Sequence, residues 1–215
     1  VPQSGITDYK LVSKKIYDIL IKNGVKFFFN HKVSNIISQK NNKIIVCTEN
    51  NSIESDYVIN ITGLYSDKLS ELSTKIDHKI IPFRGEYYNL KPHAHHLVKN
   101  LIYPVPNPDF PFLGVHFTRK IHGGIESGPN AVFAFKREGY SFFDFNIKEF
   151  FESILYIGFI KVALKYWKDG FMEIYRSINK YAYLRSMQKL IPEVKINDIE
   201  RGNSGVRAQA IKKNG

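Results

Sequence analysis

The residues best suited to chemistry lie among prolines and aromatic side chains in the middle of the chain. Only seven of the 31 basic residues are arginine; Arg84 and Arg119 lie in this stretch, and Arg207 follows in residues 205–209. The planar guanidinium of arginine can bind a carboxylate through two parallel hydrogen bonds, which lysine cannot do. We therefore predict that these arginines bind an acidic group. For any one of them taken alone, a structural salt bridge has equal weight.

His116 is the candidate catalytic base. It lies in a predicted strand, so the alternation of strand side chains puts it on the same face as Thr118, with Arg119 next along the chain. A neighbouring positive charge lowers the pKa of a histidine and keeps the ring neutral, as a base requires. Considered in isolation, a satisfied core histidine remains the default interpretation.

Several common catalytic and metal-binding patterns do not occur in the sequence. It contains no G-x-G-x-x-G, Walker A, G-x-S-x-G or H-E-x-x-H motif. His93, His95 and His96 follow Pro92 with no carboxylate nearby, which favours a solvated loop over a metal site. Cys47 is the single cysteine, so no disulfide can form within the chain. We expect no metal site.

The first third of the sequence predicts a helix, a small β-meander, and a strand that opens into a second helix. Apolar residues recur at helical spacing over residues 8–23, with Asp8 as the N-cap and Gly24 as the stop. Short strands are predicted at residues 25–29, 33–38, 43–48 and 55–61, with a polar turn at 49–52. The last strand runs into Thr62-Gly63 and a helix at 66–73, which presents backbone N–H groups to a ligand.

The rest of the sequence predicts an antiparallel sheet followed by helices. Between residues 79 and 134, strand-like pieces are separated by Pro and Gly, which favours antiparallel pairing with shaped loops. These pieces are residues 80–83, 86–90, 101–104, 113–118 and 132–135. Residues 146–192 are expected to form two or three helices.

The net charge of +11 raises the question of an anionic partner. The basic residues are scattered and mostly lysine, so we expect no nucleic-acid partner. Residues 153–160 carry no charge, and such a helix is either buried or dips into a membrane surface. We favour burial and keep peripheral membrane contact through residues 153–164 as the alternative, since a spanning helix needs about 20 apolar residues. No targeting signal is visible, so we expect a cytoplasmic protein, with a peripheral position on the inner face of a membrane left open.

Several longer segments together resemble one family of flavoenzymes. They are residues 2–9 (PQSGITDY), 60–67 (NITGLYSD), 82–88 (PFRGEYY), 103–106 (YPVP), 110–119 (FPFLGVHFTR), 128–131 (GPNA) and 205–210 (GVRAQA). These segments are similar to the L-2-hydroxyglutarate oxidase/dehydrogenase family, a branch of the glycine oxidase and D-amino-acid oxidase superfamily. The resemblance covers nearly the whole chain, and its longer motifs are specific.

The resemblance implies non-covalently bound FAD and oxidation of the 2-hydroxyl of L-2-hydroxyglutarate to 2-oxoglutarate, with hydride transfer to the flavin. It implies that Arg207 binds the substrate carboxylate and that His116 takes the hydroxyl proton. Further substrate-binding residues would be Arg119, Arg84 and Tyr103. The implied cofactor contacts are Val33 at the adenine, together with Thr62, Gly63 and Gly205.

The same resemblance implies part of a Rossmann-like FAD-binding domain joined to an antiparallel-sheet substrate domain with helices, an α+β or α/β fold. The expected boundaries are 1–78 for the partial FAD-binding domain, 79–198 for the substrate domain, and 199–215 for a return to the FAD-binding domain. The family's N-terminal G-x-G-x-x-G and C-terminal FAD loop do not occur here. Both ends are therefore interpreted as cuts in a longer polypeptide, and the segment alone is expected to be inactive.

Two alternative functions remain open from the sequence. Another member of the superfamily would oxidise an amino acid or glycerol 3-phosphate. A non-catalytic, basic, membrane-associated module would explain the charge but not the segments rich in Pro, Gly and Arg. The electron acceptor is open between oxygen and a quinone.

Overall fold

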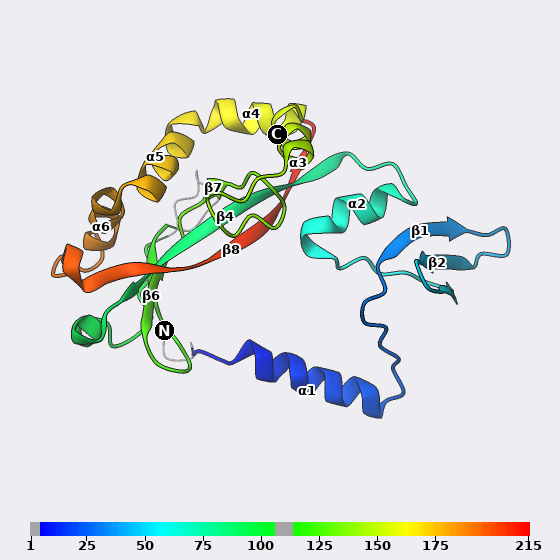
Figure 1. Cartoon of the computed structure of the whole chain (residues 1–215), viewed down its shortest axis with the longest axis horizontal. Helices are drawn as coiled ribbons and strands as arrows, with labels where there is room; N and C mark the ends of the chain where they lie inside the picture. Colours follow the sequence, from blue (N-terminus) through cyan, green and yellow to red (C-terminus); the bar gives the residue numbers. More distant parts are fainter. Residues whose placement is uncertain (1–4, 106–113) are drawn as a thin grey trace. The chain divides into compact units, whose positions relative to one another are not determined.

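The structure, a computed structural model, describes residues 5–105 and 114–215. Residues 2–4 of the first motif, residue 106 of YPVP and residues 110–113 of FPFLGVHFTR lie outside this described part. The chain divides into two compact units, Val1–Ile76 and Asp77–Gly215. Each unit combines helices with antiparallel strands, which confirms the predicted mixed fold (Figure 1).

The first helix of the first unit forms as predicted. It is α1 (Tyr9–Lys22), and the carboxylate of Asp8 caps it by accepting hydrogen bonds from two backbone N–H groups of the first turn, at 2.9 and 3.2 Å. The helix ends at Asn23, and Gly24 follows with a φ of +79°, a conformation that favours glycine. Both capping predictions are confirmed.

A three-stranded antiparallel meander follows α1. β1 (Val33–Ser38) and β2 (Ile44–Thr48) pair as predicted. The third strand, β3 (Ser52–Ser55), starts in the predicted polar turn and pairs with β2. The turn between β2 and β3 is therefore shorter than the sequence pattern predicts.

Two predicted strands of this unit are wrong. Residues 25–29 form no ladder, and Phe27 instead packs against Tyr17 of α1 with ring centroids 4.6 Å apart. Beyond β3, the segment up to residue 61 has no strand pairing, and its Tyr57, Ile59 and Ile61 are 86%, 84% and 87% exposed. A short apolar run does not reveal whether a partner strand is available. The turn Gly63–Tyr65 and α2 (Ser66–Glu71) then confirm the predicted second helix.

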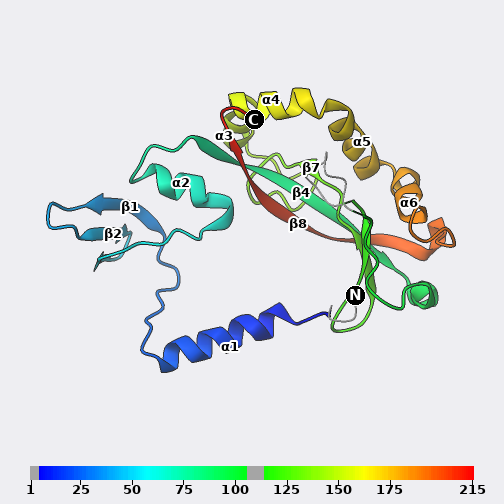
Figure 2. The same cartoon turned by 180° about the vertical axis from the view of Figure 1, so that it is seen from behind.

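The second unit is built on two long antiparallel strands. β4 (His78–Leu90) and β8 (Ile199–Lys212) pair along their length and lie side by side in both views (Figures 1 and 2). On its other edge β4 pairs with β6 (Ile125–Gly128) and β7 (Val132–Phe133), and β6 pairs with β5 (His116–Arg119). The predicted antiparallel sheet is confirmed.

β4 is one continuous strand where the sequence pattern predicts two. Gly85 lies at the junction, and a Cβ there would lie 2.7 Å from the Cβ of Pro129. Glycine therefore lets the chain around Pro129 cross close over the strand. A bulge between Glu86 and Tyr88 then shifts the register with β8.

Four helices follow the sheet strands, where two or three were predicted. They are α3 (Ile147–Ile154), α4 (Ile157–Lys165), α5 (Trp167–Ile178) and α6 (Lys180–Gln188). The apolar segment 153–160 is divided between α3 and α4, and only Ser153 and Gly158 in it are buried. The predicted burial of this segment is therefore wrong for most of its residues. No helix in residues 5–105 or 114–215 is long and apolar enough to cross a membrane.

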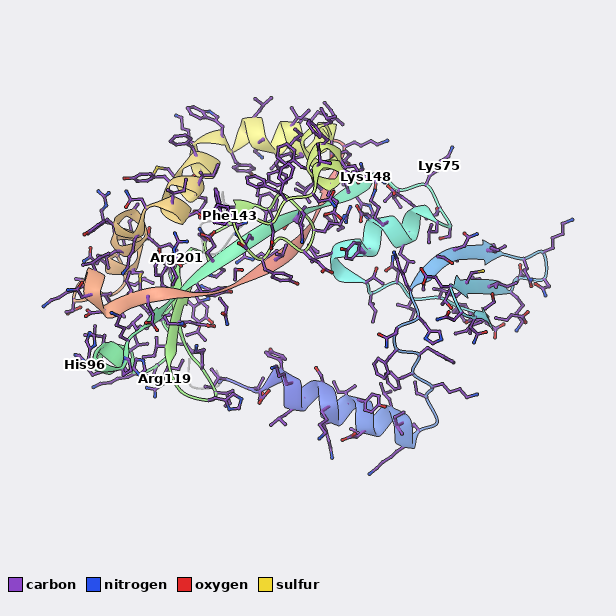
Figure 3. The ribbon with its side chains drawn as sticks, viewed as in Figure 1. Lys75, His96, Arg119, Phe143, Lys148 and Arg201 are labelled. Carbon is purple, nitrogen blue, oxygen red and sulfur yellow. The ribbon has the colours of Figure 1, made fainter. Side chains whose placement is uncertain are left out.

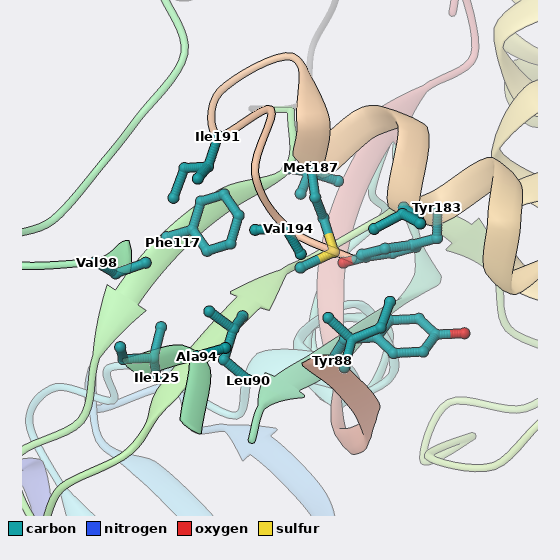
Figure 4. Close-up of a cluster of buried hydrophobic side chains, with 13 residues drawn as sticks. Tyr88, Leu90, Ala94, Val98, Phe117, Ile125, Tyr183, Met187, Ile191 and Val194 are labelled. Atoms are coloured by element: carbon teal, nitrogen blue, oxygen red, sulfur yellow. The ribbon is translucent and has the colours of Figure 1, made fainter. Parts of the chain in front are cut away.

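The main core of the second unit lies between the sheet and α6 (Figure 4). Tyr183 and Met187 of α6 pack in this cluster with Tyr88, Phe117 and Ile125, all of them at most 3% exposed. These residues come from β4, β5 and β6 as well as α6, so the cluster fixes the strands that carry His116.

Residues 199–215 belong to the second unit by their contacts, through the pairing of β8 with β4. Their assignment to the FAD-binding domain stays a prediction, as do the domain boundaries at residues 78 and 198.

Candidate functional site

His116 is half-buried at the start of β5 and stacks on the ring of Tyr103. The two ring centroids lie 4.4 Å apart and the planes are 22° apart. His116 Nδ1 lies 3.2 Å from the carbonyl oxygen of Gly114, which can only accept, so Nδ1 carries a proton and donates this bond. In the neutral ring, Nε2 then holds the lone pair and can accept a proton.

Burial is the main effect that lowers the pKa of His116. The hydrogen bond to Gly114 raises the pKa, and the positive charge of Arg207 lowers it. A cation does act on the pKa of His116, and the role of His116 as a base stays a prediction. The cation that acts on it comes from β8, however, rather than from the neighbouring Arg119.

Arg207 lies on a sheet face that is partly uncovered. It is the direct partner of Phe83 across β8 and β4, so both side chains are on one face, as are the positions of Gly85 and Gly205. A Cβ built on Gly205 would meet no atom of the described residues within 4 Å. Beside Arg207 there is therefore room for a ligand to approach the strand backbone.

Tyr87 is a site residue that the sequence reasoning missed. A Cβ on Gly128 would lie 2.7 Å from the Tyr87 ring, and Gly128 is the strand partner of His116. Burial raises the pKa of Tyr87 and the charge of Arg207 lowers it, so these two residues are close enough to interact. Tyr87, His116, Tyr103 and Arg207 thus form one group. The sequence did contain a signal for Tyr87, because this residue lies two positions after Gly85 in the PFRGEYY motif.

Arg84 is engaged inside the protein. It is 1% exposed, its Nε and Nη2 lie 3.1 and 3.0 Å from Oε1 of Glu86, and its Nη1 donates to the carbonyl of Ser141 at 3.1 Å. Asn130 completes the network, because its Nδ2 donates to Oε2 of Glu86 and its Oδ1 accepts from the Glu86 backbone. Strand alternation puts Arg84 on the opposite face of β4 from Phe83, the strand partner of Arg207. The structural salt bridge is present, and a role in substrate binding stays a prediction.

Arg119 lies at the far end of β5, close to the turn Pro92–Leu97 (Figure 3). Its Nη1 lies 3.3 Å from the carbonyl oxygens of both Val98 and Lys99. Strand alternation turns its side chain away from the face of His116. The structure therefore does not bring Arg119 into the group around His116, and its predicted contact with substrate stays a prediction.

Glu173 is a buried acid that no local sequence pattern marks. It is 7% exposed on α5, its Oε2 accepts a hydrogen bond from the Ala131 backbone at 3.0 Å, and Arg176 pairs with it. Burial raises its pKa, while Arg176, the bond from Ala131 and the charge of Arg207 lower it. Glu173 therefore ties α5 to the segment before β7, within electrostatic reach of Arg207.

The residues expected to contact FAD include two glycines with open surroundings. In the first unit Gly63 has a φ of +55°, and a Cβ there would meet no atom within 4 Å in the part of the chain that the structure describes. Thr62 donates to Oδ1 of Asn60 from its hydroxyl at 2.8 Å and from its backbone at 3.2 Å, which holds the turn. Val33 is half-buried at the start of β1. In the second unit Gly205 is open, as described above. These features fit a flat ligand lying against backbone, and the individual contacts stay predictions.

The histidines of residues 93–96 bind separate partners. His93 Nε2 lies 2.9 Å from Oδ1 of Asp198, a carboxylate from a distant part of the chain. His95 Nε2 donates to the Leu90 carbonyl at 2.9 Å, and His96 Nδ1 donates to the His93 carbonyl at 2.8 Å. Within the described part of the chain, no group of three His, Cys, Asp or Glu residues could hold a metal ion.

Comparison with known proteins places this chain in a family. The sequence matches the FAD-dependent oxidoreductase (DAO) family over residues 1–215. An L-2-hydroxyglutarate dehydrogenase from Indibacter alkaliphilus is 50% identical over 217 residues, covering 100% of this chain and 54% of the relative. The mitochondrial L-2-hydroxyglutarate dehydrogenase of Homo sapiens is 42% identical over 226 residues, covering 100% and 49%. The chain spans about half the length of the curated relatives it matches.

A solved structure with a similar fold is the dithionite-reduced L-α-glycerophosphate oxidase of Mycoplasma pneumoniae with FAD bound. Its TM-score is 0.63 at 18% identity, and the match covers 92% of this chain and 44% of the oxidase. At this identity the likeness supports the fold alone. The family match over the whole sequence and the similarity to flavoenzyme folds agree with the resemblance drawn from the motifs. The chain belongs to the FAD-dependent oxidoreductase family.

Proposed function

We propose that this protein oxidises the 2-hydroxyl of L-2-hydroxyglutarate to give 2-oxoglutarate, with FAD as its cofactor. The observation that carries the proposal is the group formed by His116, Tyr87 and Arg207, which combines a histidine whose pKa is lowered, a hydroxyl and a cation. The identity of 50% and 42% to two L-2-hydroxyglutarate dehydrogenases supports this choice of substrate.

In the proposed reaction His116 is the general base. Because Nδ1 donates to Gly114, Nε2 is the atom that accepts the proton of the substrate hydroxyl. FAD, when bound, supplies the acceptor for the hydride that leaves C2. The oxidation then leaves a 2-oxo group on the product and a proton on His116. Stacking of Tyr103 orients the imidazole and shields one face of it from water.

Arg207 is proposed to bind the carboxylate next to the reacting carbon. Burial raises the pKa of Tyr87, so its hydroxyl is protonated near neutral pH and can donate a hydrogen bond to the same carboxylate. A dicarboxylate also needs a second cation. Arg84 and Arg119 are the proposed candidates, and each would have to exchange its present hydrogen bonds for the substrate.

Each unit has its own residues that are proposed to contact FAD. Val33, Thr62 and Gly63 belong to the first unit, and Gly205 belongs to the second. The open surroundings of Gly63 and Gly205 support this assignment, because a side chain there would lie in the space that a bound ring needs.

Dye reduction by the full-length flavoprotein tests the proposed substrate. We expect turnover with L-2-hydroxyglutarate and little with its D-enantiomer, glycerol 3-phosphate or amino acids. Arg207→Met should raise KM about 100-fold or more, because the substrate carboxylate would lose the cation proposed to bind it. Arg201→Met is the matched control on the same strand, since Arg201 is exposed. Turnover of glycerol 3-phosphate in preference to L-2-hydroxyglutarate would refute the proposal.

The partners beyond the substrate are also proposals. Oxygen or a quinone is the proposed electron acceptor, and oxygen uptake compared with quinone reduction distinguishes them. We propose a cytoplasmic location with a peripheral position on the inner face of a membrane. Membership of an enzyme family favours an oxidoreductase at the membrane surface over a non-catalytic basic module.

A further inference from the structure

A stripe of large apolar side chains is exposed on α4 and α5. Its members are 37–72% exposed and are Ile160, Leu164, Trp167, Phe171, Ile174 and Ile178. Their spacing of 4, 3, 4, 3 and 4 residues puts the members within each helix on one face. Phe159 faces inward instead and packs on Phe133 of the sheet, with ring centroids 4.9 Å apart. The helices thus have a packed face and, separately, this exposed stripe.

Lysines accompany the stripe along α4 and the start of α5. Lys161, Lys165 and Lys168 each follow a stripe residue, and the sequence has no Asp or Glu from residue 153 to 168. The Nζ of Lys165 lies 5.0 Å from the ring centroid of Tyr166, and the Nζ of Lys168 lies 5.6 Å from that of Trp167. Aromatic rings beside lysine ammonium groups are typical of side chains at a membrane–water interface.

An apolar pocket of about 470 Å³ opens between the sheet and the helices α4 and α5, and three stripe residues line it. Trp167 and Phe171 line it from the helix, and Phe83 and Phe133 line it from the sheet. Flexible acyl chains can enter such a hollow without a fixed shape. A second copy of this chain is a poorer occupant, because it would bring Lys161 and Lys165 of the two copies together, and the sequence has no Asp or Glu from residue 153 to 168 to pair with them.

We propose that α4 and α5 lie on the surface of an anionic lipid membrane, with the stripe among the upper acyl chains and the lysines at the headgroup phosphates. The proposal deepens, and rests on, the peripheral position proposed above. The membrane contact is now assigned to residues 160–178 rather than to residues 153–164.

Vesicle binding by the 215-residue chain tests this proposal, with Trp167, its only tryptophan, as the reporter. We expect binding to vesicles containing about one third phosphatidylglycerol, a blue shift of Trp167 emission, and weaker binding at high salt. Vesicles of phosphatidylcholine alone should bind much more weakly. Replacing Lys161, Lys165 and Lys168 together by Gln should weaken binding about 100-fold, since each lysine near an anionic surface contributes a factor of about five.

Variants within the stripe separate this surface from others. Leu164→Glu combined with Phe171→Glu should abolish both binding and the blue shift. Phe143→Glu is the matched control, because Phe143 is 90% exposed and lies outside the stripe. Circular dichroism checks that each variant is folded. If the double glutamate variant is unfolded, the triple lysine variant provides the test instead.

Three results would overturn the proposal. One is binding without a change in Trp167 emission, which would point to another surface such as α1. Another is equal binding to vesicles with and without anionic lipid. The third is a dimer in lipid-free solution, seen by sedimentation, that the stripe variant dissociates. None of these measurements depends on turnover, so a negative result leaves the proposed oxidation untouched.

Discussion

Tyr183→Phe removes one oxygen atom from the core and tests how β4 and β6 are held together. Tyr183 is 0% exposed, and its hydroxyl lies 3.0 Å from the Ser127 carbonyl and 3.3 Å from the Glu86 carbonyl. Glu86 borders the bulge of β4, and Ser127 precedes Gly128, the strand partner of His116. The hydroxyl therefore joins the two strands next to the candidate site.

The expected loss of unfolding free energy is about 1–3 kcal/mol. A net hydrogen bond contributes about 1 kcal/mol, and the loss of this donor at the Ser127 carbonyl adds a desolvation penalty. Phenylalanine retains the ring and its contact with Tyr88, whose centroid lies 4.5 Å away, so packing should change little. Tyr181→Phe is the matched control on the same helix. Tyr181 is 64% exposed, and its change should stay within about 0.5 kcal/mol.

Urea unfolding followed by Trp167 emission measures this effect, because the single tryptophan lies in the second unit. The midpoint should fall without a change in the m value. Burial raises the pKa of Tyr183 well above the usual 10, so the stability from its neutral hydroxyl is full below pH 10 and is lost as the pH rises through the folded pKa. The difference between wild type and Tyr183→Phe should therefore be constant between about pH 6 and 9.

Equal midpoints for Tyr183→Phe and Tyr181→Phe would refute this reasoning, since they would mean that the buried hydroxyl holds neither strand. A difference that varied between about pH 6 and 9 would refute the assigned protonation state.

Further predictions concern the site and its supports. In the full-length flavoprotein, His116→Asn should lower kcat for L-2-hydroxyglutarate by about 10²–10⁴. The wild-type rate should fall on acidification with a pKa below 6.5, because burial lowers the pKa of His116, and kinetics across pH check both statements. Burial raises the pKa of Glu173, so wild-type stability relative to Glu173→Gln should be highest below pH 4.5 and decline as the pH rises through the folded pKa; parallel urea midpoints across pH would contradict this. Gly85→Ala should cost about 1–3 kcal/mol through its clash with Pro129, as measured by urea unfolding. Gly205→Ala, whose new Cβ has no atom of residues 5–105 or 114–215 within 4 Å, should leave stability unchanged and weaken FAD or substrate binding. The 215-residue chain, which has no G-x-G-x-x-G, should elute colourless from gel filtration after incubation with FAD, and a retained yellow colour would count against this.

The sequence by itself determined the features that depend on neighbouring residues. The cap of Asp8 and the stop at Gly24 are short-range effects, and both form as predicted. The motifs around His116 and Arg207 were sufficient to identify the family, because long runs of specific residue types are rarely shared by chance. The alternation of strand and turn residues likewise predicted the antiparallel sheet.

Only the tertiary structure decided which of these residues meet. The sequence does not distinguish the roles of Arg84, Arg119 and Arg207. In the structure, Arg84 donates to Glu86, and Arg119 donates to the carbonyls of residues 98 and 99. Arg207 instead acts on His116 from another strand. Tyr87 joins them through the pairing of β5 with β6 and the close packing at Gly128, contacts between strands far apart along the chain. Cross-strand register and the choice of internal partner arise from long-range packing, and that is why local patterns named the candidates without selecting among them.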